Sequence, residues 1–309
     1  MAAYTLEQLK ADVKAGAIDT VLVAFPDMQG RLIGKRFQAE FFLEGAIDET
    51  HGCDYLLAND IDMEPVPGYE AANWAKGYGD FVMKPDVTTL MKCTWLEGTA
   101  LILCDLVDHH HHEPIPHSPR AMLKAQLARL DKMGFSANFA SELEFYLFNE
   151  TFRGAYDKGY RNMETAGYYI EDYHIFQTTK EEGVMRALRK HLQASGIPVE
   201  NSKGEWGPGQ EEINVRYAEA LLMADRHTVL KNATKEIAFL QGKAVTFMAK
   251  WNAALPGSSG HLHQSLWRGK TNVFAQAGRG LSPVLRAYLH LLQNRGQWLA
   301  VPATTEGRT

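Results

Sequence analysis

The pattern of hydrophobic and polar positions changes its period along the chain, and the first third favours strands. Apolar runs bounded by turn residues predict strands at 21–26, 31–37 and 99–106. The first two flank a turn at 27–30, as in a hairpin. Together with a short helix over residues 4–15, this strand-rich part predicts a small mixed domain covering residues 1–108.

A stretch rich in proline and histidine, residues 108–120, predicts a linker after this first part. Its four consecutive histidines, His109 to His112, would suit a metal or a solvated loop. The loop is favoured because nothing nearby supplies further ligands. Ser118 is expected to cap the next helix, with Pro119 at its first position.

The pattern beyond the linker alternates between helical and strand periods. Helices are predicted at 180–194, 218–241 and 282–294, and strands around Glu142, Ile213, Val245 and His261. The fold class is therefore expected to be α+β, with a second and larger domain over residues 113–309.

The segment FASELEFYLF, residues 139–148, alternates as a strand with Leu143, Phe145 and Leu147 on one face. Glu142 and Glu144 lie on the other face. Two carboxylates inside so apolar a run are costly to bury unless a cation or hydrogen bonds compensate them. A metal role is favoured over a plain solvated face.

Three more acids, Glu205, Glu211 and Glu212, flank a turn rich in glycine and proline within GEWGPGQEEINVRY. Such a turn is expected to bring Glu205 close to one of the later pair. Carboxylate oxygens suit hard divalent cations. An acidic surface loop explains this segment equally well.

The segment GSSGHLHQSLW places His261, His263 and Ser265 on one face of an extended strand. One imidazole could bind a metal while its neighbour contacts a phosphate or carboxylate. Two hydrogen-bonded histidines on a half-buried strand are an equal alternative, until the acids upstream are considered.

Taken together, the acids and the histidine form a set that fits two neighbouring metals bridging a phosphorylated substrate: Glu142, Glu144, Glu205, Glu212 and His261. The chain has no Walker A loop, because Gln264 stands where its first glycine belongs before Gly269-Lys270-Thr271. A nucleotide would therefore be held through metal, histidine and basic side chains.

Four segments, FASELEFYLF, GEWGPGQEE, FMAKW and PGSSGHLHQSLW, resemble the glutamine synthetase family in their order and spacing. The similarity covers roughly residues 15 to 290. The stretch 60–79 and the residues of the last segment look more like the type III and glutamine-synthetase-like branch, which includes gamma-glutamyl ligases for amines. The resemblance implies a β-grasp domain followed by a catalytic α+β domain.

The resemblance also implies roles for single residues. It implies metal ligands at Glu142, Glu144, Glu205, Glu212 and His261, nucleotide contacts at Tyr217, His263 and Ser265, and a substrate contact at Gly257. The sequence departs from the family at Pro256, where an asparagine is usual, and at Ser259-Gly260, where glycine-methionine is usual. These departures bear on glutamate recognition.

The implied reaction is an ATP-dependent ligation that needs Mg²⁺ or Mn²⁺ and proceeds through a gamma-glutamyl phosphate. Ammonia is the first expectation for the nucleophile, and an organic amine or polyamine is the alternative, as is an inactive scaffold. The family forms stacked hexameric rings, in which a neighbouring subunit supplies an acid to the ammonium site. Three residues are candidates for that acid: Asp54, Asp60 and Asp62.

Composition and the chain end limit the remaining possibilities. A net charge of −5 gives no basic footprint for nucleic acid, and no apolar stretch is long enough to span a membrane. The three cysteines lack CxxC spacing, which favours a reducing, cytoplasmic location. The resemblance stops after about Leu292, before the segment that in the family carries substrate-binding arginines, so little ligase activity is expected of this chain alone.

Overall fold

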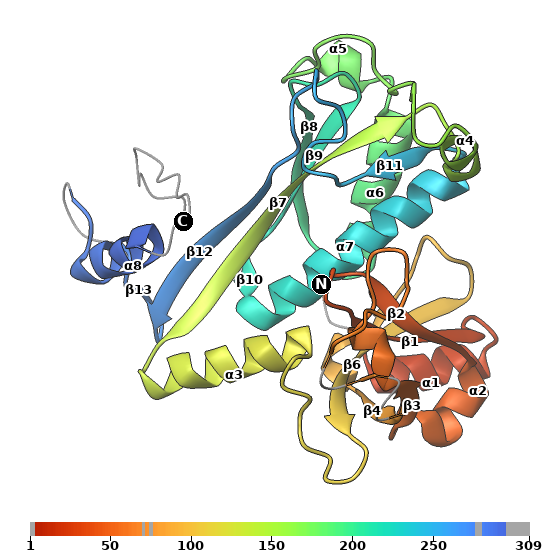
Figure 1. Cartoon of the computed structure of the whole chain (residues 1–309), viewed down its shortest axis with the longest axis vertical. Coiled ribbons are helices and arrows are strands. Elements are labelled where there is room, and N and C mark those ends of the chain that lie inside the picture. The colour runs from red at the N-terminus through yellow and green to blue at the C-terminus, as the bar shows by residue number, and fades with distance from the viewer. Residues whose placement is uncertain (1–3, 70–71, 74–76, 276–279, 295–309) are drawn as a thin grey trace.

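A computed structural model of the chain describes residues 4–69, 72–73, 77–275 and 280–294. The fold contains two β-sheets, a six-stranded one in the N-terminal part and a seven-stranded one in the rest. The long helix α7 (Ala220–Leu240) runs between them (Figure 1). The expected α+β fold class is therefore confirmed.

The N-terminal sheet has the strand order β2-β1-β6-β4-β3, with β5 pairing to β6. Its strands are β1 (Thr20–Pro26), β2 (Leu32–Gln38), β3 (Thr50–Cys53), β4 (Asp80–Pro85), β5 (Met91–Lys92) and β6 (Thr99–Asp108). The predicted hairpin is confirmed, because β1 and β2 pair antiparallel. β1 and β6 pair parallel, and the helix α1 (Leu6–Lys14) packs on the sheet, as expected of a β-grasp arrangement.

Short helical turns connect the strands of this N-terminal sheet. They are α2 (Ala39–Phe41), a π-helical turn (Phe42–Ala46) and two 3₁₀ turns (Asp54–Leu57 and Val87–Thr89). The first helix, α1, begins with a capping box in which Thr5 and Gln8 bond reciprocally to each other's backbone N–H. Two backbone donors of its first turn are thereby satisfied.

The second sheet is antiparallel and is built around the long strand β7. Its strands are β7 (Ser136–Phe148), β8 (Val199–Gly204), β9 (Gln210–Val215), β10 (Ala218–Glu219), β11 (Ala244–Thr246), β12 (Gly260–Arg268) and β13 (Thr271–Asn272). The order is β13-β12-β7-β9-β8, and β10 and β11 also pair with β7. Because β12 and β9 flank β7 on its two edges, side chains from all three strands can converge on one face.

The second part has the four predicted helices, with small shifts, and two short helices, α4 and α5, that were not predicted. They are α3 (Pro119–Lys132), α4 (Phe152–Asp157), α5 (Ile175–Thr178), α6 (Glu182–Ala194), α7 (Ala220–Leu240) and α8 (Pro283–Asn294). The helix predicted from residue 218 begins later, because Ala218 and Glu219 pair with β7 and the Glu219 carboxylate caps the helix. Ser118 occupies the predicted cap position and Pro119 the first position of α3, but the Ser118 side chain accepts no hydrogen bond from the helix.

One hydrophobic core joins the two parts of the chain. The face of β7 predicted to be apolar, with Leu143, Phe145 and Leu147, is buried against α6 and α7. The same core includes Leu101 and Leu103 from the N-terminal sheet. The opposite face of the N-terminal sheet forms a second core with α1. The two sheets are therefore held at a fixed relative position by apolar packing.

A buried arginine adds a polar connection between the same layers. Arg120 on α3, with a side chain only 3% exposed, donates to Asp225 of α7 at 2.9 Å. It also donates to Asp86 at 2.9 Å and to Asp105 at 2.6 Å in the N-terminal part. Since an uncompensated buried charge is costly, these three carboxylates and the guanidinium depend on one another.

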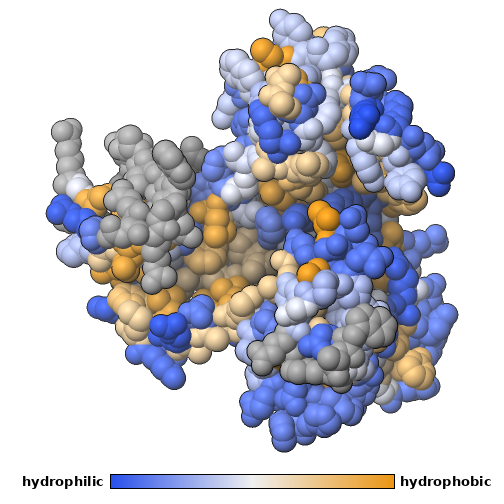
Figure 2. Space-filling model, in the orientation of Figure 1, coloured by the Kyte–Doolittle hydropathy of each residue, from blue (hydrophilic) through white to orange (hydrophobic). Residues whose placement is uncertain are grey.

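The linker histidines His109 to His112 lie exposed in a turn, as predicted for a solvated loop. Asp108 orders this turn by accepting backbone N–H bonds from His110, His111 and Glu113. Within the described part of the chain, no helix has the length and apolarity to cross a bilayer. Figure 2 shows apolar side chains gathered along the projecting arm of β12 and α8 and in the hollow beside it.

Candidate metal and nucleotide site

Three carboxylates meet where β7, β8 and β9 run side by side. Glu144 on β7 and Glu212 on β9 are direct partners in the strand register. Glu205 follows β8 and faces them across the turn between β8 and β9. Each of the three offers a ligand oxygen within 4.8 Å of the others. The prediction that this turn brings Glu205 close to a later acid is confirmed, and that acid is Glu212.

Hydrogen bonds orient two of these carboxylates. Glu144 accepts from the backbone N–H of Ser259 at 2.8 Å and from the Gln210 amide at 3.1 Å. Glu212 accepts from the Asn214 amide at 2.6 Å. The carboxylates are thus fixed by donors from β9 and from the loop before β12. These donors carry no charge, so they leave the negative charge of the cluster in place.

Among the residues that the structure describes, one ammonium group, that of Lys203, lies against the cluster. Lys203 contacts the carboxylate of Glu205 and lies 3.9 Å from that of Glu212. Burial by itself would raise the pKa of Glu205, but the bond from Lys203 keeps it below its usual value. Burial and the bond with Glu205 raise the pKa of Glu212 to about 7. Burial also raises the pKa of Glu144. The protein therefore holds excess negative charge at this point.

Glu142 continues the acidic face of β7 toward β12. Its two carboxylate oxygens bond to His261 Nδ1 at 2.8 Å and to His263 Nε2 at 3.0 Å. Both histidine side chains are at least half exposed, and they share one face of β12, as the alternation predicts. His261 is the register partner of Glu142. Both imidazoles are thus oriented by a carboxylate, a common arrangement in metal sites.

The other predicted nucleotide residues lie farther along the same strands. Ser265 is half-buried on β12, where its hydroxyl donates to the Asn138 carbonyl at 3.3 Å and accepts from Trp267 Nε1 at 2.9 Å. Tyr217 is exposed just before β10. Neither residue contacts the carboxylate cluster among the described hydrogen bonds.

The loop at Gly257 passes close to the preceding segment. A Cβ at this position would lie 2.6 Å from the Ala249 carbonyl oxygen, so only glycine allows the approach. Gln210 donates to the Gly257 carbonyl at 2.9 Å, and the Tyr146 hydroxyl donates to the Pro256 carbonyl at 2.9 Å. Gln210 therefore joins this loop to Glu144 of the cluster. A steric constraint therefore explains why position 257 is glycine, independently of any contact with a substrate.

The three acids proposed for an ammonium site lie in the N-terminal part. Asp60 accepts from the backbone N–H groups of Asp62 and Glu64 at 2.9 and 3.0 Å, so it orders a turn. Asp54 accepts from the backbone N–H of Gly79 at 3.1 Å. Within the described residues of this chain, the structure does not bring these acids to the carboxylate cluster.

The donor set fits hard divalent cations. Three carboxylates with one lysine leave net negative charge, and carboxylate oxygens are the ligands that Mg²⁺ and Mn²⁺ prefer. Glu142 and His261 add an oxygen and a nitrogen beside it. The sequence prediction missed the roles of Gln210 and Asn214. Both are on β9 beside the acids, and their amides could have been recognised as donors to carboxylates inside an apolar strand.

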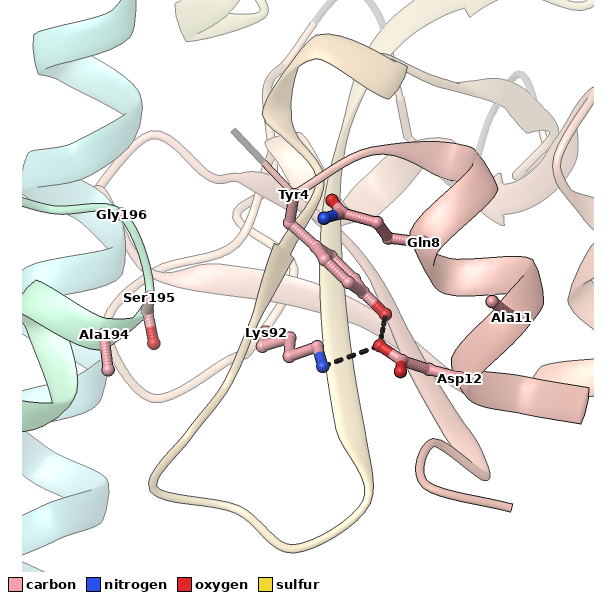
Figure 3. A pocket seen from close by; sticks show the side chains of 8 residues that line it. All are labelled: Tyr4, Gln8, Ala11, Asp12, Lys92, Ala194, Ser195 and Gly196. Atoms are coloured by element: carbon pink, nitrogen blue, oxygen red, sulfur yellow. Dashed lines mark hydrogen bonds and ion pairs between the residues drawn. The ribbon is translucent and has the colours of Figure 1, made fainter. Parts of the chain in front are cut away.

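A separate cleft of about 320 Å³ lies between α1 and the end of α6 (Figure 3). Its charged groups satisfy each other, since Asp12 pairs with Lys92 at 2.6 Å and accepts from the Tyr4 hydroxyl at 2.7 Å. Ala194, Ser195 and Gly196, at the end of α6, form the opposite wall. Glu144, Glu205 and Glu212 do not line this cleft.

The family model of the glutamine synthetase catalytic domain matches residues 116–302, more than half of the 309 residues. The chain belongs to the glutamine synthetase family. The match continues past Leu292, so the prediction that the resemblance ends there was wrong. Residues 276–279 and 295–309 within or beyond this region lie outside the described structure.

Curated members of the glutamine synthetase family include close relatives of this chain. The gamma-glutamylethanolamide synthetase GlnA4 of Streptomyces coelicolor is 45% identical over 92% of this chain and 61% of its own length. The glutamate–isopropylamine ligase of a Pseudomonas species is 36% identical over 81% of this chain and 54% of its own. The chain thus spans about three fifths or less of the length of these relatives.

A solved glutamine synthetase-like structure has the same fold. The structure of apo GmaS without ligand is similar over 95% of this chain and 64% of its own, with a TM-score of 0.77 and 26% identity. A complex of GmaS with ADP gives the same TM-score of 0.77. The N-terminal sheet and the second sheet are therefore both part of a known arrangement.

Proposed function

We propose that this chain carries the metal- and nucleotide-binding wall of an ATP-dependent ligase that joins glutamate to an organic amine. The observation that supports this most is the cluster of Glu144, Glu205 and Glu212 beside the Glu142–His261 pair. A phosphoryl-transfer site needs fixed groups that hold cations against phosphate oxygens. The amine follows from the named activities of the two curated relatives.

In the proposed site, Glu144, Glu205 and Glu212 hold one divalent ion, and Glu142 with His261 hold a second. When bound, these ions supply charge neutralisation for the phosphates of ATP. His263, kept in place by Glu142, contacts a phosphate oxygen, and Ser265 and Tyr217 contact the nucleotide. The Ser259 N–H and the Gln210 amide keep the carboxylate of Glu144 turned toward the ion.

The acid substrate is proposed to lie near the loop at Gly257, whose carbonyl is fixed by Gln210. Its activated carboxyl group would be attacked by the amine, with phosphate as the leaving group. Ammonia was the first expectation from the sequence. The two relatives named for ethanolamide and isopropylamine products favour an organic amine instead. Pro256 and Ser259, at positions where the family usually has other residues, agree with an altered substrate site.

We also propose that residues 1–108 and 113–309 form two domains, and that copies of the chain assemble as in the family, by resemblance to stacked hexameric rings. In such an assembly, the N-terminal domain of a neighbour would supply Asp54, Asp60 or Asp62 to the amine site. The exposed apolar side chains along β12 and α8 agree with a surface that becomes covered in an assembly (Figure 2).

The nucleophile is tested by a competition assay. The chain alone, and a chimaera in which residues 4–275 replace the equivalent part of the Streptomyces coelicolor relative, are supplied with glutamate, ATP and Mn²⁺. Ethanolamine, isopropylamine and ammonium are present together, and mass spectrometry counts the amides. We expect an organic amide to exceed glutamine by about tenfold or more in the chimaera. A folded chimaera that makes mainly glutamine would contradict the proposal.

Two matched variants distinguish loss of the carboxylate cluster from loss of folding. Glu144→Gln in the chimaera should abolish amide formation while leaving the circular dichroism spectrum unchanged. Glu200→Gln changes an exposed glutamate of β8 and should leave the rate unaltered. Equal rates for Glu144→Gln and the parent chimaera would remove the carboxylate cluster from the proposed mechanism.

A further inference from the structure

A second group of three glutamates converges on the other side of β9. Glu171 comes from the loop before α5, Glu181 stands at the start of α6, and Glu211 is on β9. Each offers a carboxylate oxygen within 4.8 Å of the others. All three are buried, with 0%, 3% and 1% of their surfaces exposed. Three carboxylates are thus enclosed together away from solvent.

Most of the oxygens in this buried group have no partner. Both carboxylate oxygens of Glu181, one of Glu171 and one of Glu211 are buried and accept no hydrogen bond from any described residue. The remaining oxygen of Glu171 accepts a hydrogen bond from the backbone N–H of Gly209 at 2.9 Å. Buried polar atoms are nearly always hydrogen-bonded in native proteins, so these oxygens require an explanation.

No basic side chain of the described structure neutralises the group. Lys180, Arg189 and Lys243 influence its charge, but each bonds elsewhere. Lys180 contacts Gln177 and the Tyr168 hydroxyl, Arg189 contacts Ser202 and Glu182, and Lys243 contacts Asn149. The cluster of Glu144, Glu205 and Glu212 has Lys203, whereas this group has no equivalent. Burying such charge unpaired is strongly unfavourable.

The backbone is shaped to admit one of these carboxylates. A Cβ at Gly167 would lie 1.4 Å from Glu171 Oε1, and a Cβ at Gly204 would lie 2.8 Å from the Glu171 backbone oxygen. Gly209, which donates to Glu171, has a φ of +71°, in the region that favours glycine. Gly167 and Gly204 therefore make room for Glu171, and Gly209 donates a hydrogen bond to its carboxylate, which together indicate a built site.

We propose that Glu171, Glu181 and Glu211 form a buried cation site, distinct from the candidate catalytic cluster, that takes one hard divalent ion of the Ca²⁺, Mg²⁺ or Mn²⁺ class. All the ligand atoms are carboxylate oxygens, which these ions prefer over nitrogen or sulfur ligands. The ion satisfies the unpartnered oxygens and offsets their mutual repulsion.

Such an ion would join three elements that are distant in sequence. Glu171 anchors the loop before α5, Glu181 the start of α6, and Glu211 the strand β9. Because side chains alternate along a strand, Glu211 and Glu212 point to opposite faces of β9. Occupancy behind β9 therefore stabilises the strand that presents Glu212 to the candidate catalytic cluster.

The test counts bound ions in a chain whose catalytic cluster has been disabled. The parent for the comparison is the Glu144→Gln Glu212→Gln double variant of the full chain. Equilibrium dialysis against Ca²⁺, followed by elemental analysis, should find an ion that is lost when Glu181→Gln is added. Glu200→Gln, on the exposed part of β8, should leave the count unchanged. A Mg²⁺ arm run in the same way reports the preference between the two ions.

Thermal unfolding gives an independent readout. Ca²⁺ at about a hundredfold excess over its dissociation constant should raise the melting temperature of the parent by about 5 °C, and this increment should vanish in Glu181→Gln. Glu181 is chosen because neither of its carboxylate oxygens accepts a hydrogen bond, so the amide replaces it without breaking one. Glu211→Gln serves as the second variant if Glu181→Gln does not fold.

The competing explanation is that the three carboxyls share protons and hold no ion, since burial raises the pKa of Glu181 to about 7. In that case the parent shows the same ion count with and without Glu181→Gln, and the variant changes the melting temperature equally in EDTA and in Ca²⁺. That result would overturn the proposal, whereas a loss of ion and of the Ca²⁺ increment in either variant supports it.

Discussion

Replacing Glu212 with glutamine should stabilise the metal-free protein and weaken its stabilisation by Mn²⁺. The carboxylates of Glu144, Glu205 and Glu212 lie within 4.8 Å of one another. Two unit charges at that separation repel by about 3.5 kcal/mol at an effective dielectric constant of about 20. Glu212 has two such neighbours, so the repulsion that it meets is about 7 kcal/mol. Lys203, at 3.9 Å, offsets about 4 kcal/mol. The net repulsion that the substitution relieves is therefore about 3 kcal/mol.

We expect a gain of about 1–3 kcal/mol in the free energy of unfolding at pH 8 in EDTA, after allowance for solvent screening. The sign follows from the pKa of Glu212, which is raised to about 7 in the folded protein. A raised carboxyl pKa means that the folded state loses stability as pH rises from the ordinary value through 7. The gain should therefore be largest at pH 8 and should disappear below about pH 4.5.

Mn²⁺ should offset most of this difference in stability between the variant and wild type. At a concentration a hundred times its dissociation constant, an ion that binds only the folded state stabilises it by about 2.7 kcal/mol. Wild type should gain this amount at the cluster, and Glu212→Gln should gain much less, because it has lost a charged ligand. Urea unfolding at pH 8, with and without Mn²⁺, measures both effects, with Glu200→Gln as the exposed control.

Two results would refute this reasoning. In the first, Glu212→Gln is less stable than wild type in EDTA, which would mean that the carboxylates do not repel one another in the folded protein. In the second, the variant gains as much from Mn²⁺ as wild type does, which would mean that the ion does not use Glu212. An ion bound behind β9 would stabilise both proteins alike, so it does not affect the difference between them.

Three further predictions concern the rest of the structure. Arg120→Met should lower the free energy of unfolding in urea by about 3–5 kcal/mol, because it leaves the buried carboxylate of Asp225 unpaired, whereas Arg129→Met on the exposed side of α3 should change it by less than about 0.5 kcal/mol; equal effects would contradict this. Burial lowers the pKa of His227 to about 4, so the unfolded state binds more protons than the folded state between that value and the ordinary one. Stability should fall by about 1–2 kcal/mol from pH 7 to pH 5, and His227→Gln should lack that part of the slope in chemical unfolding at the two pH values. Gly257→Ala should lower the free energy of unfolding by about 1–3 kcal/mol, measured by thermal unfolding, since its Cβ would lie 2.6 Å from a carbonyl oxygen. Gly260→Ala, whose Cβ would have its nearest atom at 3.7 Å, should lower it less. The opposite order would show that the loop adapts freely.

Much of the second sheet could be predicted from local pattern. The alternation of Glu142 to Leu147 predicts both the buried face of β7 and the acidic face opposite it, and the structure has both. The spacing of His261 and His263 predicts a shared face, and both histidines bond to Glu142. The alternation lies in residue chemistry, since Glu144 and Tyr146 on the acidic face of β7 are buried like the apolar residues opposite them.

Contacts between distant segments could not be predicted in the same way. Glu171, Glu181 and Glu211 come from a loop, a helix start and a strand, and no spacing in the sequence joins them. The start of α7 was predicted two residues early, because the pairing of Ala218 with β7 is a tertiary contact. At the start of α7 this strand pairing overrode local helix propensity, whereas the meeting of the three glutamates depends on how whole elements pack.

We propose that the acidic cluster holds the ions through which a nucleotide binds. The most direct test is calorimetric titration of the chain with ATP, with and without Mn²⁺, for wild type and the Glu144→Gln Glu212→Gln variant. We predict that wild type binds ATP at least about tenfold more tightly with Mn²⁺ than without, and that the variant loses this dependence. ATP binding that is indifferent to Mn²⁺ in wild type, or equally Mn²⁺-dependent in the variant, would contradict the account.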